Sequence, residues 1–452
     1  MIVQLSTFSN AWGEAPVAAP TSALVDYVRK PDASYAWKLR REGDLGTGRY
    51  AELILTSQRW HDITWRHQLF IYKPAKLRHL DRGLLLVGGG RWRDELLNPP
   101  TADEKLPNEA GLLAGMADKL ETVVAVVLQV PNQPILGDLY EDAAISYSFE
   151  QFIKTGESDW PLLLPMVKSA VRAMDAVGAF SQEHWQVKPV KFTLTGASKR
   201  GWTTWLTSAV DERVTALAPM VIDMLNMPEH IRLQMTSWGK FSEQIHDYTQ
   251  RGLHLALMTP AGGRLLDAVD PFRYRERLVQ PKLVLLGTND RYWPLDSANL
   301  YFNDLPADKY LLYVPNNGHG LRDMLRVVGG IAALHRHGAG DLTLPKLTWD
   351  YRDMADGGEA NPGVELTIRS DQKPASVQVW SSKSATRDFR EAVWTAQPVK
   401  EEDGRYVYRL PMPEAGMAAL IGEALYDDAV MPYYLSTAVR IIGGASKPVG
   451  GQ

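Results

Sequence analysis

The sequence predicts an α/β protein with a mostly parallel central sheet and a β-rich domain at its C-terminal end. Two observations carry this prediction. Between about residues 83 and 337, continuous apolar runs alternate with segments of helical spacing, which is the pattern of a sheet covered by helices on both faces. After about residue 340 the apolar period changes to two, with Pro, Gly and Asp between short segments. This second pattern is typical of an antiparallel β-sandwich.

The elements of the α/β part are expected in the following order. Residues 51–55 and 68–72 are β-type runs joined by a polar turn, so we expect an antiparallel pair. Buried parallel strands are expected at residues 83–87, 122–130, 190–195, 214–222, 282–287 and 309–314. Helices are expected at residues 104–120, 161–180, 200–210 and 321–337, from their helical spacing.

Two breaks in this alternation predict the domain organisation. Residues 223–280 are too long for one crossover helix and are rich in Met, Trp, His and Tyr, as in a helical lid inserted over a site. We expect an N-terminal extension at 1–30, the α/β domain at 31–340, and a β-sandwich domain of the immunoglobulin or fibronectin type at 341–452. Sandwich strands are expected at residues 364–368, 375–380, 406–410, 418–422 and 436–441.

Composition excludes several classes of function. The 452 residues carry 49 Lys and Arg against 53 Asp and Glu, a net charge of −4 with no basic cluster, so nucleic-acid binding is not expected. Cysteine is absent and the histidines lack metal-ligand spacing, so we expect neither a metal nor a cofactor. No apolar run approaches the ~18 residues that a membrane span needs. Nothing in the pattern indicates an oligomeric state.

The segment at residues 193–202 (TLTGASKRGW) offers a candidate nucleophile. An expected strand runs into Gly196, Ala197 and Ser198, and a helix follows at once. A serine at such a turn lies above the carboxyl edge of the sheet, where open α/β folds bind ligands. The spacing departs from G-x-S-x-G, because the second glycine, Gly201, comes one residue later. On this segment alone a helix N-cap is an equal alternative, since serine is preferred at that position.

Two further strand ends supply the partners that a serine nucleophile needs. Asp290 and His319 each follow the end of an expected strand. The chain order Ser, Asp, His is that of the α/β-hydrolase triad, in which histidine takes the serine proton and the carboxylate orients the imidazole. We therefore expect Ser198, Asp290 and His319 to be catalytic. Asp223 also follows an expected strand and is the alternative acid.

The oxyanion hole is expected from the main-chain N–H groups of Gly89, Gly90 and Lys199. Residues 88–90 are three successive glycines directly after an expected strand. They would let the backbone approach a developing oxyanion without a Cβ in the way. A lone triple glycine is more often a flexible turn. No Gly-Lys-Ser/Thr follows it, so a phosphate-binding loop is not expected.

Cations and aromatic residues near these segments are candidates for substrate contacts. They are Arg91, Trp92, Arg200, Trp202, Trp238 and Trp293. For Lys199 and Arg200 two roles are open. One of them could reach the oxyanion or a substrate carboxylate while the other pairs with Glu141 or Asp142, or both could form structural ion pairs.

These residues indicate a serine hydrolase, and in the first place a carboxylic-ester hydrolase that forms an acyl-enzyme with a small-molecule substrate. A serine peptidase or amidase with the same triad is one alternative, because a lid and a β-sandwich also suit peptides. A non-catalytic secreted protein for binding or signalling, built on the same fold, is the other alternative.

The motifs resemble those of the PhoPQ-activated pathogenicity-related protein family. The matching runs are GASKRGWT (196–203), PMVIDMLNM (219–227), GTND (287–290), VPNQP (130–134), EDA (141–143) and DFR (388–390). The similarity spans about residues 24 to 441. It implies an α/β-hydrolase-like fold with poorly defined substrates, and a periplasmic or secreted protein.

Two features qualify what the resemblance implies. Residues 1–10 lack a basic start and an apolar core, so we expect no intact signal peptide in this chain. The G-x-S-x-x-G spacing with a basic residue after the serine is also similar to that of glucuronoyl esterases. This second resemblance implies esters of acidic or sugar-like compounds.

Overall fold

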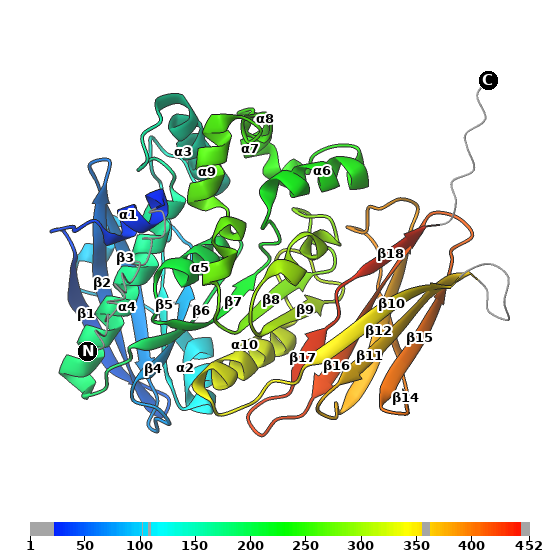
Figure 1. The fold of residues 1–452 in the computed structure, drawn as a ribbon. Helices are drawn as coiled ribbons and strands as arrows, with labels where there is room; N and C mark the ends of the chain where they lie inside the picture. The colour runs from blue at the N-terminus through cyan, green and yellow to red at the C-terminus, as the bar shows by residue number, and fades with distance from the viewer. Residues whose placement is uncertain (1–21, 102, 107–109, 355–361, 444–452) are drawn as a thin grey trace, which may run out of the picture.

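The computed structural model describes residues 22–101, 103–106, 110–354 and 362–443, so residues 1–21 of the expected N-terminal extension lie outside the described ranges. Nine strands of the α/β part form its central sheet (Figure 1). They are β1 (Ala36–Leu45), β2 (Gly48–Trp60), β3 (Ile63–Lys73), β4 (Arg82–Val87), β5 (Val123–Val127), β6 (Lys191–Ala197), β7 (Val214–Met220), β8 (Lys282–Gly287) and β9 (Lys309–Val314).

The strand order is β1-β2-β3-β5-β4-β6-β7-β8-β9. The first three strands are antiparallel, and those from β5 to β9 run parallel to one another. This arrangement confirms the predicted α/β-hydrolase fold. Every residue of β5 and β8 is buried, as their continuous apolar sequences predict for strands covered on both faces. The carboxyl ends of the parallel strands therefore meet at one edge of the sheet.

Helices cover both faces of the sheet. On one face lie α1 (Ala23–Arg29), α4 (Leu163–Trp185) and α5 (Lys199–Val210), and on the other lie α2 (Ala110–Leu120) and α10 (Met324–Ala339). The expected helix at 104–120 is too long at its start, because residues 104–106 are not helical and α2 is described from Ala110. Residues 23–29 fall in the range expected as an extension, yet they form a helix whose Leu24 is fully buried. The side chain of Tyr27 in this helix donates a hydrogen bond to Gln58 Oε1 at 3.0 Å.

Short helices gather above the carboxyl edge of the sheet, at the top of Figure 1. One is α3 (Glu141–Thr155), which the sequence did not lead us to expect. The others lie between β7 and β8, within the range expected as a lid. They are α6 (Met227–Trp238), α7 (His246–Thr249), α8 (Leu253–Ala256), α9 (Pro260–Val269) and the 3₁₀ turns Glu243–Ile245 and Pro271–Arg277.

The C-terminal residues form the expected β-sandwich. One layer contains β12 (Ser376–Ser384), β13 (Thr395–Pro398), β16 (Met417–Tyr426), β17 (Tyr433–Ser436) and β18 (Arg440–Gly443); the other contains β10 (Leu347–Met354), β11 (Gly363–Ser370), β14 (Glu401–Glu402) and β15 (Arg405–Pro411). The single strand expected at 436–441 is therefore two strands, β17 and β18. The first layer also continues the central sheet, because β17 pairs with β9 through Ser436 and Leu311.

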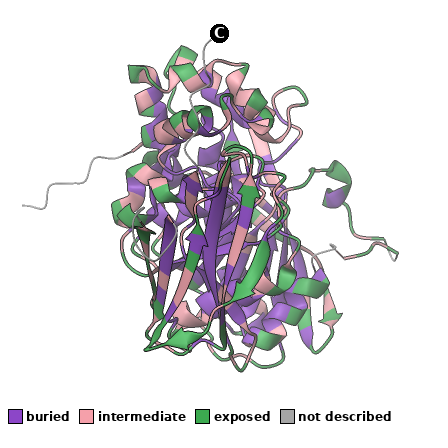
Figure 2. Cartoon of the chain, turned by 90° about the vertical axis from the view of Figure 1, so that its right-hand side faces the viewer, coloured by how far each residue is buried: buried purple, intermediate pink, exposed green. Residues whose placement is uncertain are grey.

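Burial follows these layers. Figure 2 shows buried residues concentrated on the inner strands, whereas exposed residues lie at the outer surface of the strands, helices and loops. One apolar cluster joins residues of α2, α10 and the parallel strands to residues of both sandwich layers. Helix α10 supplies Ile331 and Leu334, and the sandwich supplies Leu366 and Leu420. The sandwich thus shares a core with the α/β part.

Candidate active site

The turn between β6 and α5 holds Ser198 in a sparsely populated backbone conformation. Its φ is 58° and its ψ is −125°, and its side chain makes no capping hydrogen bond to α5. Local capping therefore does not explain this serine. Strained backbone of this kind costs free energy and is found at functional sites. The geometry matches the sharp strand-to-helix turn expected for a nucleophile.

The two glycines around Ser198 allow strand and helix to come close together. A Cβ at Gly196 would lie 2.7 Å from Arg200 O, and a Cβ at Gly201 would lie 2.9 Å from both Gly196 O and Met220 O. Real Cβ atoms do not approach backbone oxygens this closely. The packing of α5 on β6 and β7 therefore requires the second glycine three residues after the serine. This explains the departure from G-x-S-x-G.

Asp290 and His319 form a hydrogen-bonded pair at the ends of β8 and β9. Asp290 Oδ2 lies 2.8 Å from His319 Nδ1, and Asp290 Oδ1 accepts a bond from the Tyr292 N–H at 2.8 Å. His319 Nε2 is buried and has no hydrogen-bond partner in the described part of the chain. Ser198 and His319 line the same cavity, although no hydrogen bond joins their side chains in this structure.

The alternative acid, Asp223, makes no hydrogen bond to His319. It follows β7, is buried, and is not part of the cavity wall around Ser198. Burial raises the pKa of its carboxyl well above the usual range, and the charges of Asp290 and Asp296 raise it further. The carboxylate that bonds to His319 is thus Asp290. A side chain that favours the protonated form is poorly suited to stabilise an imidazolium.

Of the three glycines after β4, Gly89 packs against Arg200, whereas Gly90 lies beside Gln129. A Cβ at Gly89 would lie 2.5 Å from Arg200 Nη2, and Gly90 has a φ of 119° that disfavours other residues. The N–H groups of Gly89, Gly90 and Lys199 donate no hydrogen bond to another described residue. The oxyanion role expected for these three N–H groups stays a prediction. Of the three residues, only Lys199 contributes to the wall of the cavity.

Lys199 and Arg200 are ion-pair partners of α3. Lys199 Nζ lies 2.9 Å from Asp142 Oδ2 and 3.4 Å from Glu141 Oε2. Arg200 donates from Nη1 and Nη2 to the two oxygens of Glu141, at 2.7 Å each, and from Nε to Val130 O at 2.5 Å. The structure therefore decides between the two roles left open by the sequence. Both cations are neutralised, and Arg200 does not line the cavity.

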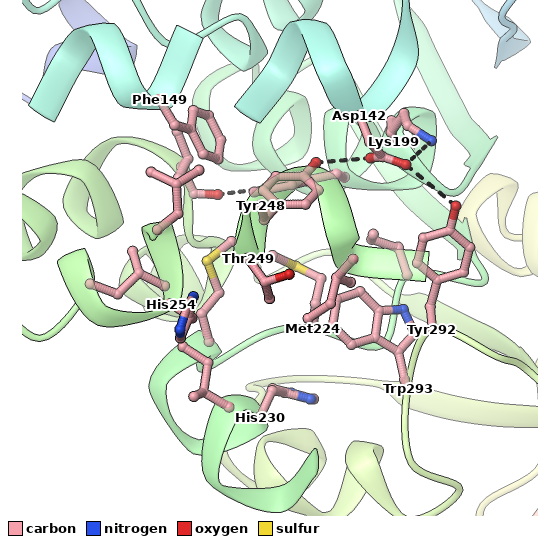
Figure 3. Close-up of a pocket in the computed structure, with 18 of the residues that line it drawn as sticks. Asp142, Phe149, Lys199, Met224, His230, Tyr248, Thr249, His254, Tyr292 and Trp293 are labelled. Atoms are coloured by element: carbon pink, nitrogen blue, oxygen red, sulfur yellow. Dashed lines mark hydrogen bonds and ion pairs between the residues drawn. The ribbon is translucent and has the colours of Figure 1, made fainter. Parts of the chain in front are cut away.

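Asp142 connects three segments of the site. Besides Lys199, its carboxylate accepts hydrogen bonds from Tyr248 Oη at 2.9 Å and from Tyr292 Oη at 3.3 Å (Figure 3). The ring of Tyr292 lies against the imidazole of His319, with 4.2 Å between the ring centroids. Burial, followed by the charge of Asp142, raises the pKa of both tyrosines. Both are therefore neutral donors at neutral pH.

The cavity next to Ser198 has a volume of about 910 Å³, counting its opening to solvent. Of the residues expected as possible substrate contacts, Trp202 and Trp293 line this cavity, whereas Arg91, Trp92 and Trp238 do not. Trp92 instead donates to Asp94, the Arg91 guanidinium lies over the ring of Tyr140, and Arg390 lies over the ring of Trp238. We therefore do not carry these three forward as substrate contacts.

Several residues of the site were missed from the sequence. Tyr292 lies two residues after Asp290 in the same strand-end turn, so its place near His319 could have been expected. Tyr248, His230 and Phe149 come from α7, α6 and α3. No local signal placed these three residues, because their helices reach the cavity only through tertiary packing.

Within the ranges that the structure describes, no group of three or more His, Asp or Glu side chains is arranged to hold a metal ion. No described helix combines the length and apolar character needed to cross a bilayer.

Sequence comparison identifies the relatives of the chain. A sequence profile of the PhoPQ-activated pathogenicity-related protein family matches residues 24–390. The chain belongs to this family. Autocrine proliferation repressor protein A of Dictyostelium discoideum is 31% identical to it over 438 residues, which are 90% of this chain and 86% of that protein. These matches confirm the predicted family relationship.

Solved structures with a similar fold are much more distant in sequence. An acetyl xylan esterase from Paenibacillus sp. R4 aligns with 68% of this chain and 90% of its own, at 14% identity and a TM-score of 0.46. A glucuronoyl esterase from Solibacter usitatus aligns with 66% of this chain and 86% of its own, at 13% identity and a TM-score of 0.36. The family profile reaches Arg390, between β12 and β13, so the match extends into the sandwich.

Proposed function

We propose that this member of the PhoPQ-activated pathogenicity-related protein family is a serine hydrolase that cleaves carboxylic esters. One observation carries the proposal. Asp290 Oδ2 lies 2.8 Å from His319 Nδ1, and His319 Nε2 is buried beside the cavity that Ser198 lines, with no hydrogen-bond partner among the described residues. A buried nitrogen without a hydrogen-bond partner costs free energy, and a hydrogen bond formed during the reaction would remove that cost. The Ser198 hydroxyl is the group that would do so.

The proposed reaction has two halves, formation of an acyl-enzyme and its hydrolysis. In each half His319 acts first as a base and then as an acid. His319 Nε2 takes the proton of Ser198 Oγ as the oxygen attacks the ester carbonyl, and then gives that proton to the departing alcohol. In the second half His319 Nε2 takes a proton from a water molecule as its oxygen attacks the acyl carbonyl, and then gives that proton to Ser198 Oγ as the bond between Oγ and the acyl carbon breaks and the carboxylic acid leaves. Asp290 holds the Nδ1–H tautomer and stabilises the imidazolium. The N–H groups of Gly89, Gly90 and Lys199 would donate to the oxyanion. Catalytic hydrogen bonds are often long before substrate binds, which fits the absence of a Ser198–His319 bond.

A second candidate function comes from the relative in Dictyostelium discoideum. That protein is named as a repressor of proliferation, and it is 31% identical over most of this chain. A signalling protein on the same fold would need no reactive serine. Covalent labelling of Ser198 therefore separates the two functions.

The decisive experiment is labelling with a small fluorophosphonate, followed by peptide mapping. We expect a single adduct on Ser198, and we expect Ser198→Ala to lower kcat by about 10⁴-fold or more. Ser158→Ala, at an exposed serine, is the control and should keep wild-type activity. Absence of an adduct in the native protein would favour the signalling function.

A substrate panel separates the two kinds of hydrolase. We expect p-nitrophenyl esters to be cleaved with a kcat/KM at least about 100-fold above that for aminoacyl-nitroanilides. The reverse order would identify a peptidase or amidase that uses the same three residues.

A further inference from the structure

The cavity beside Ser198 has walls made mainly of apolar side chains. They come from α3, α5, the end of β7 and the helices between β7 and β8. The principal ones are Phe149, Trp202, Met224, Leu253, Leu265 and Val269, all of which are buried. A wall of this kind stabilises a ligand in proportion to the apolar area it removes from water.

The charged groups at the cavity have partners within the protein. Lys199 pairs with Asp142 and Glu141, and Arg200 next to it pairs with Glu141. Two cations and two carboxylates thus form a neutral cluster. A substrate carboxylate entering the cavity would have to displace one of these anions or be buried without a counter-charge, and both are costly.

Two further polar residues of the cavity wall, Gln234 and His230, are also uncharged. Gln234 donates to Tyr292 O at 3.1 Å and accepts from Ser242 N at 2.9 Å, so both ends of its amide are engaged. His230 Nε2 bonds to Leu225 O at 2.8 Å, and burial lowers the pKa of the imidazole to about 4. His230 is therefore uncharged at neutral pH. Neither residue offers a charge for an ionic substrate.

We infer that the cavity selects an uncharged, apolar chain or ring as one side of the ester. This inference deepens the proposed function and rests on it. It departs from the acidic esters implied by the resemblance to glucuronoyl esterases. That resemblance relied on the basic residues after Ser198, which are neutralised in the folded chain.

A chain-length series tests the inference with the wild-type protein. p-Nitrophenyl acetate, butanoate, hexanoate and octanoate vary the acyl side at constant leaving group, and acetates of ethanol, butanol and hexanol vary the alcohol side. We expect kcat/KM to rise about fourfold for each added methylene that is buried, either in the acyl series or in the alcohol series. We expect the p-nitrophenyl monoester of adipate to react at least about tenfold more slowly than the hexanoate. A flat series in both arms, or faster cleavage of the adipate ester, would overturn the inference.

A matched pair of variants places the effect in this cavity. Leu257 lines the cavity, whereas Leu255, two residues earlier, is 68% exposed and does not line it. Leu257→Trp should lower kcat/KM for the longest favoured substrate about tenfold more than it lowers kcat/KM for the acetate. Leu255→Trp should leave the series as in the wild type. Equal effects of both variants on all chain lengths would contradict the assignment.

A binding measurement separates failure of this inference from failure of the proposed function. Ser198→Ala removes the proposed nucleophile, and Trp202 and Trp293 in the cavity wall report ligands through their fluorescence. We expect octanamide to bind this variant at least about tenfold more tightly than acetamide. Tight octanamide binding without any fluorophosphonate adduct in the wild type would refute hydrolysis and keep the apolar site. A fluorophosphonate adduct on Ser198 together with equal affinity for the two amides would support hydrolysis and refute the apolar site.

Discussion

At the scale of single residues, Asp142 joins three segments of the candidate site. It accepts bonds from Lys199, which follows the nucleophile, from Tyr292, which follows Asp290, and from Tyr248 of α7. Through Tyr292 it holds an aromatic ring against the imidazole of His319. Asp142 is therefore a positioning residue, because it acts on His319 only through another side chain.

Removal of Asp142 should loosen this arrangement. In Asp142→Ala we expect Ser198 to react with a fluorophosphonate up to about 100-fold more slowly, because small misplacements of catalytic groups cost factors of this size. The rate constant of labelling measures the reactivity of Ser198 directly. Asp267→Ala, at an exposed aspartate on α9, is the control. An unchanged rate in Asp142→Ala would show that Tyr292 and His319 do not depend on it.

The lowered pKa of Glu141 predicts that the free energy of unfolding depends on pH. Burial alone would raise the pKa of its carboxyl, but hydrogen bonds and charge from Arg200, with help from Gln133 and Lys199, lower it to about 2. A carboxyl with a lowered pKa stabilises the folded state above its unfolded pKa, and this stability is lost as pH falls toward the folded value.

For Glu141→Gln we expect a loss of about 1–2 kcal/mol in the free energy of unfolding at pH 7. This loss is smaller than the shift in the Glu141 pKa alone would give, because the Glu141 side chain is 37% exposed and solvent screens its interaction with Arg200. The difference from the wild type should shrink as pH falls from about 4.5 toward about 2. Urea unfolding at several pH values measures it. A difference that does not change with pH would mean that the Glu141 charge does not contribute.

At the scale of elements, the segment between β12 and β13 is hydrogen-bonded to the two loops that carry Asp290 and His319. Asn289 Nδ2 donates to the carbonyl oxygens of Phe389, Arg390 and Ala392, at 3.3, 3.2 and 2.7 Å. Asn316, three residues before His319, exchanges two hydrogen bonds with the backbone of Trp394, at 2.8 and 2.9 Å. The sandwich therefore contributes to the position of the candidate acid and base.

Asn289→Ala tests these hydrogen bonds. The variant leaves three carbonyl oxygens without their shared donor, so we expect a loss of about 1–2 kcal/mol in stability and a decrease of about tenfold in kcat with little change in KM. Asn303→Ala, at an exposed asparagine, should change neither quantity. A variant that loses stability but keeps its kcat would assign Asn289 a structural role only.

At the scale of the whole molecule, the two parts of the chain share a sheet, a core and a buried ion pair. Arg326 of α10 donates from Nε and Nη2 to the two oxygens of Glu423 of β16, at 2.9 and 3.0 Å. Trp380 and Gln378 of β12 also donate to Glu423. Glu423 is almost fully buried, so its loss would leave Arg326 with only Asp323 as an anionic partner.

We expect Glu423→Ala to lower the free energy of unfolding by about 3 kcal/mol. Urea unfolding should show one transition for the whole protein, both in the wild type and in the variant, because the α/β part and the sandwich share a core. Glu414→Ala, at an exposed position of the sandwich, is the control. Two separate transitions in the wild type would show that the two parts unfold independently.

The sequence by itself determined the α/β fold, the sandwich after it, the family, and the strand ends at which Ser198, Asp290 and His319 stand. It could do so because apolar periodicity reports burial within one element, and because parallel strands end at one edge of the sheet. That these three residues catalyse a reaction stays a prediction from both sequence and geometry.

Only the tertiary structure decided which partners the side chains have. Asp290 rather than Asp223 bonds to His319, and the cations after Ser198 pair with Glu141 and Asp142. The continuation of the central sheet into the sandwich and the contribution of α3 to the cavity were decided there too. Each of these contacts joins residues far apart along the chain. Their distances depend on how whole elements pack, and no local pattern of residue types encodes that packing.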